Sequence, residues 1–188
     1  MKNPLLIDFP HEFHTERLFL RAPLPGDGKV IYDAINASLP ELTTWMTFTT
    51  RNQGIEEAEL SVREAHILFL KREDLRFHIF RRDNRTFIGS AGLHQIDWNA
   101  RKFEVGYWID TRYSGNGYMT EAVEGLTVFA FYALTANRLE MKIDTENTKS
   151  RAIPERLGFT LEGILHKNTV GNLANDLRDT CIYAKVRD

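Results

Sequence analysis

The feature that most constrains this chain is an apolar strand that runs through a glycine-rich loop straight into an amphipathic helix. The segment 106–109 is apolar, the loop contains Arg112-x-x-Gly115-x-Gly117, and a helical pattern follows. Two glycines allow a backbone to approach a ligand closely, and the free N–H groups of a first helical turn favour negative charge. The sequence therefore predicts a phosphate-binding junction between a strand and a helix.

Two other glycine-rich phosphate loops do not fit this segment. The chain has no Gly-x-x-x-x-Gly-Lys-Ser/Thr run, so it lacks a P-loop. A dinucleotide fingerprint would need a glycine where Thr120 stands. A hairpin is the remaining alternative, because Asn116-Gly117 is a strong turn signal. The apolar residues after it recur at helical spacing, however, which favours the interpretation as strand, loop and helix.

Composition and charge are those of an ordinary globular chain. The 188 residues are 43% hydrophobic and 27% charged, and we expect a single domain over 1–188. A net charge of −2 offers no basic surface for nucleic acid, and no apolar run is long enough to span a membrane. Cys181 is the only cysteine and the N-terminus does not resemble a leader, so we expect a cytoplasmic protein.

Hydrophobic periodicity predicts an α+β domain in which helices cover the faces of a mixed sheet. Residues 1–13 show no period and are expected to form a loosely packed N-terminal arm. The expected strands are 16–21, 76–81, 86–96, 101–109, 138–144 and two that flank Gly171-Asn172, and the expected helices are 30–37, 55–71, one after Gly117 and one from Asn147. Short connections predict an antiparallel meander, and the helical crossover makes strand 138–144 parallel to the strand before it.

A second motif lies between Asn147 and Phe159. Asn147 can cap a helix, and Gly158 can end it. Pro154 falls inside that helix and has no N–H to give to the carbonyl of Ser150, so we expect a kink and a freed carbonyl. A freed carbonyl beside a hydroxyl is a candidate polar site.

Taken in order, the motifs of this chain resemble the GNAT superfamily of acetyl-CoA-dependent N-acetyltransferases. Within it they are most similar to the RimL/RimJ branch, which acetylates N-terminal amines of ribosomal proteins. The segments that carry the resemblance span nearly the whole chain and are Thr15–Arg21, Glu104–Ile109, Arg112-x-x-Gly115-x-Gly117, Asn147-x-x-Ser150, Gly158-Phe159-x-x-Glu162-Gly163 and Asp179-x-x-x-Tyr183. The resemblance implies a mostly antiparallel sheet with helices on both faces and a splayed pair of parallel central strands, opened by a β-bulge where the Trp108-Ile109 strand ends.

The resemblance also implies where acetyl-CoA, the expected cosubstrate, binds. Backbone N–H groups of the glycine loop hold the pyrophosphate, the pantetheine arm adds a pseudo-strand to the preceding strand, and the second motif lies near the sulfur. The residues implied for this site are Trp108, Ile109, Asp110, Arg112, Tyr113, Ser114, Gly115, Asn116, Gly117, Tyr118, Asn147 and Ser150. No metal is expected.

The implied reaction is direct attack of a neutral amine on the thioester, which requires deprotonation of the amine and protonation of sulfur. An α-amino group, with a pKa of ~7.8, demands less of a base than a lysine, with a pKa of ~10.4. Glu104 is the candidate base, and a carboxylate held by an arginine on a sheet face is the equal alternative. In many GNAT enzymes a tyrosine stands where this chain has Pro154 and acts as the acid that protonates the sulfur. In this chain that role passes to Ser150 or to solvent.

Four residues are candidate acceptor contacts. Trp45 and Met46 can line the acceptor cleft or belong to the core. Asp179 and Tyr183 alternate on the last strand and can meet an incoming ammonium or form a solvated face. The leading hypothesis is acetylation of a protein N-terminus. The alternatives are a small-molecule amine acceptor, such as a polyamine, amino acid or antibiotic, and an acetyl-CoA-binding module without catalysis; the resemblance also allows a homodimer.

Overall fold

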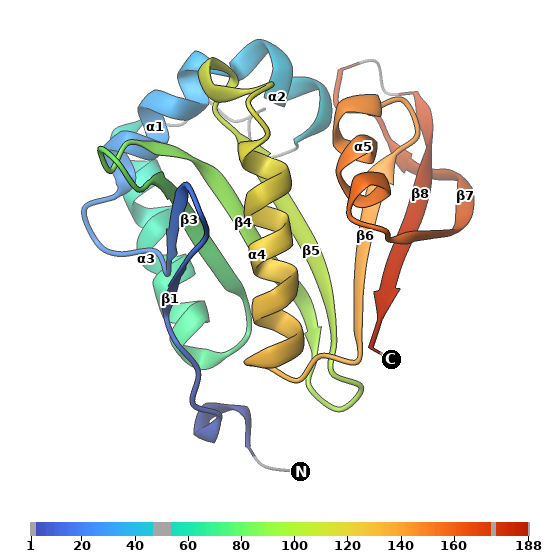
Figure 1. The fold of residues 1–188 in the computed structure, drawn as a ribbon. Helices are drawn as coiled ribbons and strands as arrows, with labels where there is room; N and C mark the ends of the chain where they lie inside the picture. The colour runs from blue at the N-terminus through green and yellow to red at the C-terminus, as the bar shows by residue number, and fades with distance from the viewer. Residues whose placement is uncertain (1–2, 47–53, 174–175, 188) are drawn as a thin grey trace.

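The computed structural model describes residues 3–46, 54–173 and 176–187, and in this part of the chain eight strands form one sheet with helices on both faces (Figure 1). The strands, in the sheet order β1-β2-β3-β4-β5-β6-β8-β7, are β1 (Glu12–His14), β2 (Leu18–Arg21), β3 (Leu75–Arg81), β4 (Phe87–Asp97), β5 (Lys102–Ile109), β6 (Arg138–Asp144), β8 (Leu177–Val186) and β7 (Thr160–Val170). The helices are α1 (Gly28–Ala37), α2 (Leu39–Trp45), α3 (Ile55–Lys71), α4 (Tyr118–Tyr132) and α5 (Thr148–Arg156), with 3₁₀ turns at Pro4–Leu6 and Thr111–Tyr113.

The predicted α+β architecture is confirmed. Strands β2 to β5 form the antiparallel meander, and β5 and β6 run parallel with α4 as the crossover between them. Helix α3 spans the residues predicted for it, because both of its ends are specified locally. The Gly54 N–H donates to the Glu57 carboxylate at 2.9 Å at the start, and Arg72 ends the helix with a φ of +64°.

The two faces of the sheet carry different helices. Helices α4 and α5 cover one face, which we call the α4 face, and α1 packs on the other, the α1 face, with α3 beside it (Figure 1). Side chains alternate along β5 between the two faces. Phe103, Val105 and Tyr107 point to the α4 face, whereas Glu104 and Trp108 point to the α1 face, where Trp108 packs with residues of α1 and β3.

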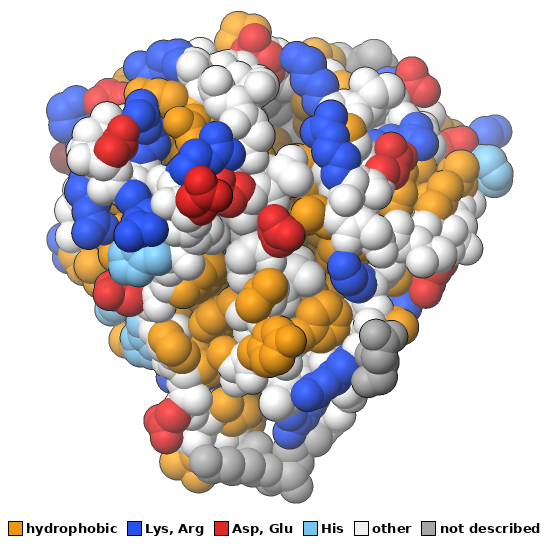
Figure 2. Space-filling view, viewed as in Figure 1, with side chains coloured by type: hydrophobic (Ala, Val, Ile, Leu, Met, Phe, Trp, Pro, Cys, Tyr) orange, Lys and Arg blue, Asp and Glu red, His pale blue; other side chains and the backbone are white. Residues whose placement is uncertain are grey.

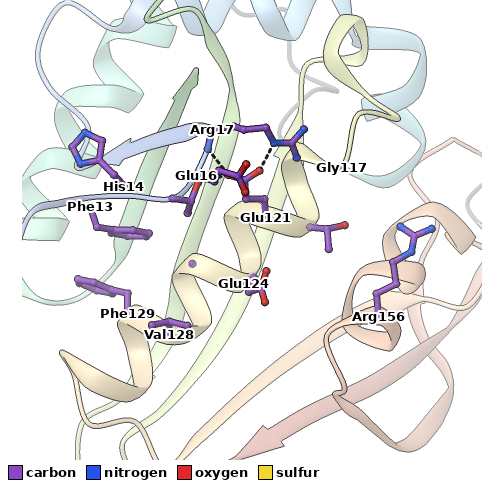
Figure 3. A pocket seen from close by; sticks show the side chains of 13 residues that line it. Phe13, His14, Glu16, Arg17, Gly117, Glu121, Glu124, Val128, Phe129 and Arg156 are labelled. Carbon is purple, nitrogen blue, oxygen red and sulfur yellow. Dashed lines mark hydrogen bonds and ion pairs between the residues drawn. The ribbon is translucent and has the colours of Figure 1, made fainter. Parts of the chain in front are cut away.

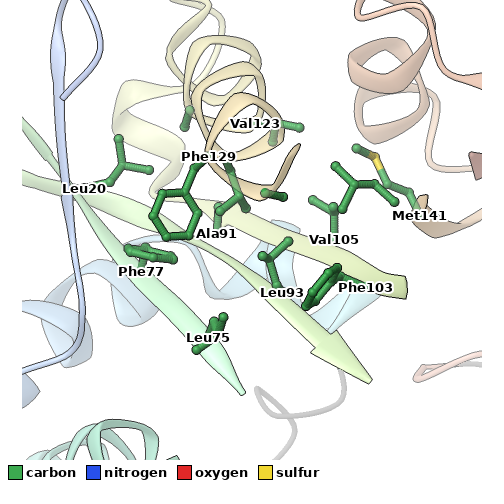
Figure 4. Packing of buried hydrophobic residues seen from close by; sticks show 14 of the residues in the cluster. Leu20, Leu75, Phe77, Ala91, Leu93, Phe103, Val105, Val123, Phe129 and Met141 are labelled. Carbon is green, nitrogen blue, oxygen red and sulfur yellow. The ribbon is translucent and has the colours of Figure 1, made fainter. Parts of the chain in front are cut away.

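The main core lies between the sheet and α4 (Figure 4). Phe129 of α4 meets Phe77 of β3 edge to face, with ring centroids 5.2 Å apart. Leu93 and Phe103 are fully buried beneath the helix. Because α4 is fixed along its length in this way, its N-terminus is held at the end of β5, where the glycine loop lies.

The N-terminal segment is better packed than expected. Phe9 is buried against Phe69 and Phe129, and the Arg72 guanidinium lies 4.1 Å from the centre of its ring. β1 pairs with β2 and becomes the edge of the sheet. The prediction of a loosely packed arm is therefore wrong for this part of the segment, because isolated aromatic residues carried the packing and left no periodic signal.

The parallel strands β5 and β6 diverge soon after they begin. Lys102 to Glu104 pair with Arg138 to Glu140, and beyond them the described part of β5 pairs with β4 alone. The predicted splay is confirmed, but the predicted β-bulge is wrong, since the register between β4 and β5 is unbroken from Val105 to Ile109. Helix α5 packs on both β6 and α4 at this end, and it closes the α4 side of the opening.

Candidate active site

The glycine loop connects β5 to α4 through a chain of local hydrogen bonds. The buried Asp110 carboxylate accepts from the Arg112 N–H at 3.0 Å and from its guanidinium, a contact that raises the pKa of Arg112. Gly115 and Gly117 have φ of +79° and +76°, which only glycine adopts without strain. The N–H groups of Arg112, Tyr113 and Ser114 are used within the loop, and the first helical bond joins the Glu121 N–H to Gly117. The N–H groups from Gly115 to Thr120 are therefore the ones left for a ligand.

A second guanidinium, that of Arg17, lies beside this loop (Figure 3). Its Nε donates to Glu121 at 2.6 Å, its Nη1 donates to the Asn116 carbonyl at 3.1 Å, and it stacks on Tyr118. Burial alone would raise the pKa of Glu121, but the hydrogen bonds from Thr15 and Arg17 outweigh it and hold that pKa below its usual value. Arg17 was not a predicted site residue, because no spacing in the sequence links it to a loop so far along the chain.

A groove of about 1030 Å³ continues from the loop along α4 (Figure 3). It passes from Gly117 over Glu121 and Glu124 to Val128, with Arg156 on its opposite wall. Glu104 and Ser150 do not line it. The groove is therefore an extension of the phosphate loop rather than the place where the β5 and β6 strands separate.

The edge of β5 at the splay offers free backbone groups. The Asp110 N–H donates to the Ile88 carbonyl of β4 at 2.9 Å. Hydrogen bonds of a strand alternate between its two neighbours, so the N–H groups of Tyr107 and Ile109 point away from β4 and into the gap. An extended amide-bearing chain fits this edge as an added strand, which suits the pantetheine arm expected there.

Tyr107 and Ser150 join the two sides of the splay on the α4 face. Asn147 caps α5 by accepting from the Ser150 N–H at 3.1 Å. The Ser150 carbonyl, freed by Pro154, accepts from the Tyr107 hydroxyl at 2.9 Å, and the Ser150 hydroxyl donates to the Tyr107 oxygen at 3.1 Å. Burial raises the pKa of Tyr107 to about 12, which keeps its proton in place. The predicted freed carbonyl is confirmed, and its partner Tyr107 was missing from the predicted site.

Glu104 lies on the α1 face, opposite to Ser150. Its carboxylate accepts from Lys142 Nζ at 2.7 Å, and this hydrogen bond raises the pKa of Lys142. The alternative expected from the sequence, a carboxylate held by an arginine, is thus right about a cationic partner and wrong about its identity. A role for Glu104 as the base stays a prediction.

Trp45 stands near the end of β6, at the mouth of the splay. Its ring lies 5.6 Å from the Arg178 guanidinium, which in turn donates to Asp144 at 2.9 Å. The Asn172 side chain donates to the Thr43 carbonyl at 3.3 Å and ties α2 to the turn between β7 and β8. Met46 follows directly as the C-terminal cap of α2.

The side chains of Asp179 and Tyr183 are both engaged by other groups of the fold. Tyr183 is 1% exposed, and its hydroxyl donates to Glu155 at 2.6 Å and accepts from Arg151, beneath α5. Asp179 accepts from His166 and from the Lys167 N–H within the β7–β8 hairpin. The expectation that they meet an incoming ammonium together is wrong for Tyr183, because a buried strand position gives its hydroxyl partners inside the fold.

Positive and negative side chains alternate on the face that carries α4 and α5 (Figure 2). Apolar side chains gather over the C-terminal half of α4, where Val128 and Tyr132 are 52% and 82% exposed. No helix among the described residues is both long and apolar enough to cross a bilayer. The visible face therefore offers no continuous acidic surface for a basic partner.

The fold places a glycine-rich strand-loop-helix junction beside two diverging parallel strands, an arrangement that suits an enzyme with a phosphate-bearing cosubstrate. The chain belongs to the acetyltransferase (GNAT) domain family, whose model matches residues 17–160. It is accordingly an acetyl-CoA-dependent N-acetyltransferase, and a module without catalysis is set aside.

Relatives carry the same activity in their names, and a solved structure shares the fold. The chain is 39% identical over 182 residues to the "Putative ribosomal N-acetyltransferase YdaF" of Bacillus subtilis (strain 168), a match that covers 90% of each. It is 29% identical over 131 residues to the spermidine N(1)-acetyltransferase of Escherichia coli (strain K12), which covers 64% of this chain and 70% of that one. A RimL ribosomal L7/L12 α-N-protein acetyltransferase solved with coenzyme A superposes with a TM-score of 0.86 over 93% of this chain and 96% of that one, at 21% identity, and so shows a shared fold.

Proposed function

We propose that this enzyme transfers the acetyl group of acetyl-CoA to the N-terminal α-amine of a protein, with a ribosomal protein as the acceptor. The observation that carries the proposal is the 39% identity, over 90% of both chains, to a relative whose name gives a ribosomal acceptor. The chemistry agrees with it. About a quarter of an α-amine with a pKa of ~7.8 is neutral near pH 7.4, so a site without a strong base is sufficient.

In this proposal the pyrophosphate lies on the N–H groups of the glycine loop, between the guanidinium groups of Arg17 and Arg112. The pantetheine arm follows the free edge of β5 at Ile109 and Tyr107, which places the thioester near Gly106. Support for this comes from the unpaired edge and from the left-handed glycines of the loop. The acceptor approaches from the α1 face, where Trp45 and Met46 lie at the mouth of the splay.

Ser150 is the proposed proton donor to the departing sulfur. Its hydroxyl is held at the splay by Tyr107, and its N–H is held by Asn147. The thiolate of CoA is a good leaving group, since thiols have a pKa of ~8.5, so the proton from Ser150 or from water is needed only late in the reaction. Positioning of the amine and the thioester supplies a large share of the acceleration.

Mass-spectrometric detection of acetyl transfer tests the acceptor. The enzyme is incubated with acetyl-CoA and a panel of peptides that begin with Ser or Ala, together with spermidine, free amino acids and aminoglycosides. We expect acetylation of the peptide α-amine, and none of the same peptides when the N-terminus is blocked and a lysine is the only amine. Acetylation of spermidine or another small amine in preference to every peptide would contradict the proposed acceptor and leave the acetyltransferase activity intact.

A further inference from the structure

A histidine lies on the α1 face at the point where β5 separates from β6. Gly92 of β4 and Gly106 of β5 are direct partners in the sheet, and the ring of His94 lies over both. A methyl group on Gly92 would come within 2.9 Å of the His94 Nε2, and one on Gly106 within 3.1 Å of the same atom. Side chains at either position would displace the ring, so the two glycines make room for an imidazole at this place.

Asp74, the residue before β3, holds this imidazole. Its Oδ2 lies 2.6 Å from His94 Nδ1, and its Oδ1 is buried without a hydrogen-bond partner among the described residues. A carboxylate in this position keeps a proton on Nδ1, leaves Nε2 as the acceptor, and stabilises the imidazolium that forms when Nε2 takes a proton. The His94 side chain is 30% exposed on the α1 face, and its Nε2 lies over Gly106.

His94 is placed differently from Glu104, its direct partner on β5. The Glu104 carboxylate is engaged by Lys142 at 2.7 Å, and Lys142 also lies 3.8 Å from Glu140. The Nε2 of His94 carries no hydrogen bond from any described residue. Of these two groups, the imidazole is the one whose basic atom has no hydrogen-bond partner among the described residues and whose other nitrogen is held.

We infer that His94, positioned by Asp74, takes the proton from the acceptor amine. This inference rests on the proposed place of the thioester near Gly106 and applies to any amine acceptor. The amine nitrogen uses its lone pair to form the bond to the carbonyl carbon, and the carbon–sulfur bond breaks with its electron pair on sulfur. The proton from nitrogen passes to His94 Nε2 and then to solvent, while the thiolate takes a proton from Ser150 or water on the other face.

Three charged residues lie beside His94 in or next to the sheet. Asp74 and Glu104 are carboxylates, and Arg76 of β3 lies next to Gly92. His94 can take the proton of the amine only while its Nε2 carries none, so kcat/KM for the acceptor should fall as the pH is lowered. Because the acceptor amine must also lose a proton, kcat/KM for the acceptor should depend on the loss of two protons in the wild-type enzyme.

The test compares His94→Gln with Glu104→Gln. Glutamine keeps a polar group toward Asp74 but cannot accept the proton at neutral pH. We expect His94→Gln to lower kcat/KM for the acceptor by about 100-fold at pH 7 and to bind acetyl-CoA normally by calorimetry. The pH profile of its kcat/KM should depend on the loss of one proton only, that of the amine. Glu104→Gln should keep the two-proton profile. In His94→Ala, added imidazole should restore part of the rate.

Two results would overturn the inference. One is a two-proton profile that survives in His94→Gln, with or without a lower rate, which would make His94 a packing residue. The other is loss of the second proton in Glu104→Gln alone, which would assign the base to Glu104. The profiles are measured with whichever amine the wild-type enzyme acetylates, so failure of the peptide acceptor would not be mistaken for failure of this inference.

Discussion

At the scale of single residues, the contact between Tyr107 and Ser150 shows how a rule broken in the sequence is compensated in the fold. A proline inside a helix removes one hydrogen bond and costs about 3 kcal/mol. Here the carbonyl that Pro154 leaves without a donor accepts instead from the Tyr107 hydroxyl at 2.9 Å. The same hydroxyl accepts from Ser150 Oγ at 3.1 Å. One tyrosine therefore stabilises the kinked helix and holds the proposed acid at the splay.

This exchange of partners predicts an energetic coupling between Tyr107 and Pro154. Tyr107→Phe should destabilise the protein by about 1–3 kcal/mol, because the Ser150 carbonyl loses its donor. In a Pro154→Ala background the cost should shrink by about 1 kcal/mol, because the new N–H can donate to that carbonyl. Urea unfolding of the four proteins measures the cycle. Tyr113→Phe is the control and should change the free energy of unfolding little. An equal destabilisation by Tyr107→Phe in both backgrounds would contradict the compensation.

At the scale of elements, the N-terminus of α4 depends on two glycines that the sequence already marked. Gly117 is the N-cap of the helix with a φ of +76°, and the Arg17 guanidinium lies 3.5 Å from the place of a methyl group there. An alanine at this position must adopt a left-handed conformation that costs about 1–2 kcal/mol, or else rotate the loop N–H groups away from the phosphate.

Gly117→Ala should therefore weaken binding of CoA by about 10-fold, which corresponds to about 1.4 kcal/mol. Gly163→Ala is the matched control, since Gly163 on β7 has no atom within 4 Å of a methyl group and no positive φ. Isothermal titration with CoA compares the two variants with the wild-type protein. Equal affinities in all three proteins would show that the loop backbone does not bind the phosphates.

The N-terminus of α1 is fixed to the sheet by Asp27. Its carboxylate accepts from Arg21 at 2.7 Å, from the Leu24 N–H at 3.0 Å and lies 2.7 Å from His78 Nδ1. Burial opposes ionisation, but the hydrogen bonds from Arg21, His78 and Leu24 outweigh it and hold the pKa of Asp27 well below its usual range. A carboxyl group with a lowered pKa stabilises the fold above its unfolded pKa, and this stabilisation is lost as the pH falls toward the folded value.

Asp27→Asn should thus destabilise the protein by about 3 kcal/mol at pH 7, because it removes the carboxylate that pairs with the largely buried Arg21 guanidinium. The difference in the free energy of unfolding between this variant and the wild-type protein should shrink below a pH of about 4, where the carboxyl group of the unfolded chain becomes protonated. Urea unfolding at pH 7 and pH 3 measures it. Asp33→Asn, which removes an exposed pair with Lys29 on the same helix, should cost less than about 0.5 kcal/mol at either pH. A pH-independent effect of Asp27→Asn would exclude the ionic origin.

The elements that the sequence predicted well are those with local signals. Helix α3 matches its predicted span, and the glycine loop and the Asn147 cap have the predicted conformations. Helix α2 was not predicted, because Pro40 near its start resembles a break, although a proline in the first turn lacks only an N–H that would be unpaired anyway. Contacts between distant segments, such as Arg17 with the loop and Asp74 with His94, leave no periodic or spacing signal. For that reason the glycine loop was predictable from the sequence, whereas the residues around the proposed acceptor side were not.

At the scale of the whole molecule, the sheet consists of two parts that share little backbone pairing. Strands β1 to β5 form one part and β6, β8 and β7 the other, and only Lys102 to Glu104 of β5 pair with β6. Helix α4 and the Tyr107–Ser150 contact connect the two parts on one face. A cosubstrate that adds a strand in the opening would supply the missing hydrogen bonds along β5, so its binding should stabilise this end of the sheet more than the rest.

Hydrogen exchange with and without CoA tests that expectation at single amides. The N–H groups of Tyr107 and Ile109 point into the gap and should gain protection, whereas that of Asp110 already donates to Ile88 and should change little beyond the global effect. At a CoA concentration of 100 Kd, ligand binding should stabilise the whole protein by about 2.7 kcal/mol. Amides far from the opening, such as that of Gly163 in the β7–β8 hairpin, report this global stabilisation. Ile109 and Asp110 are neighbouring residues that serve as probe and control, so equal changes at their two amides would contradict the added strand. Protection confined to the glycine loop would limit binding to the phosphates.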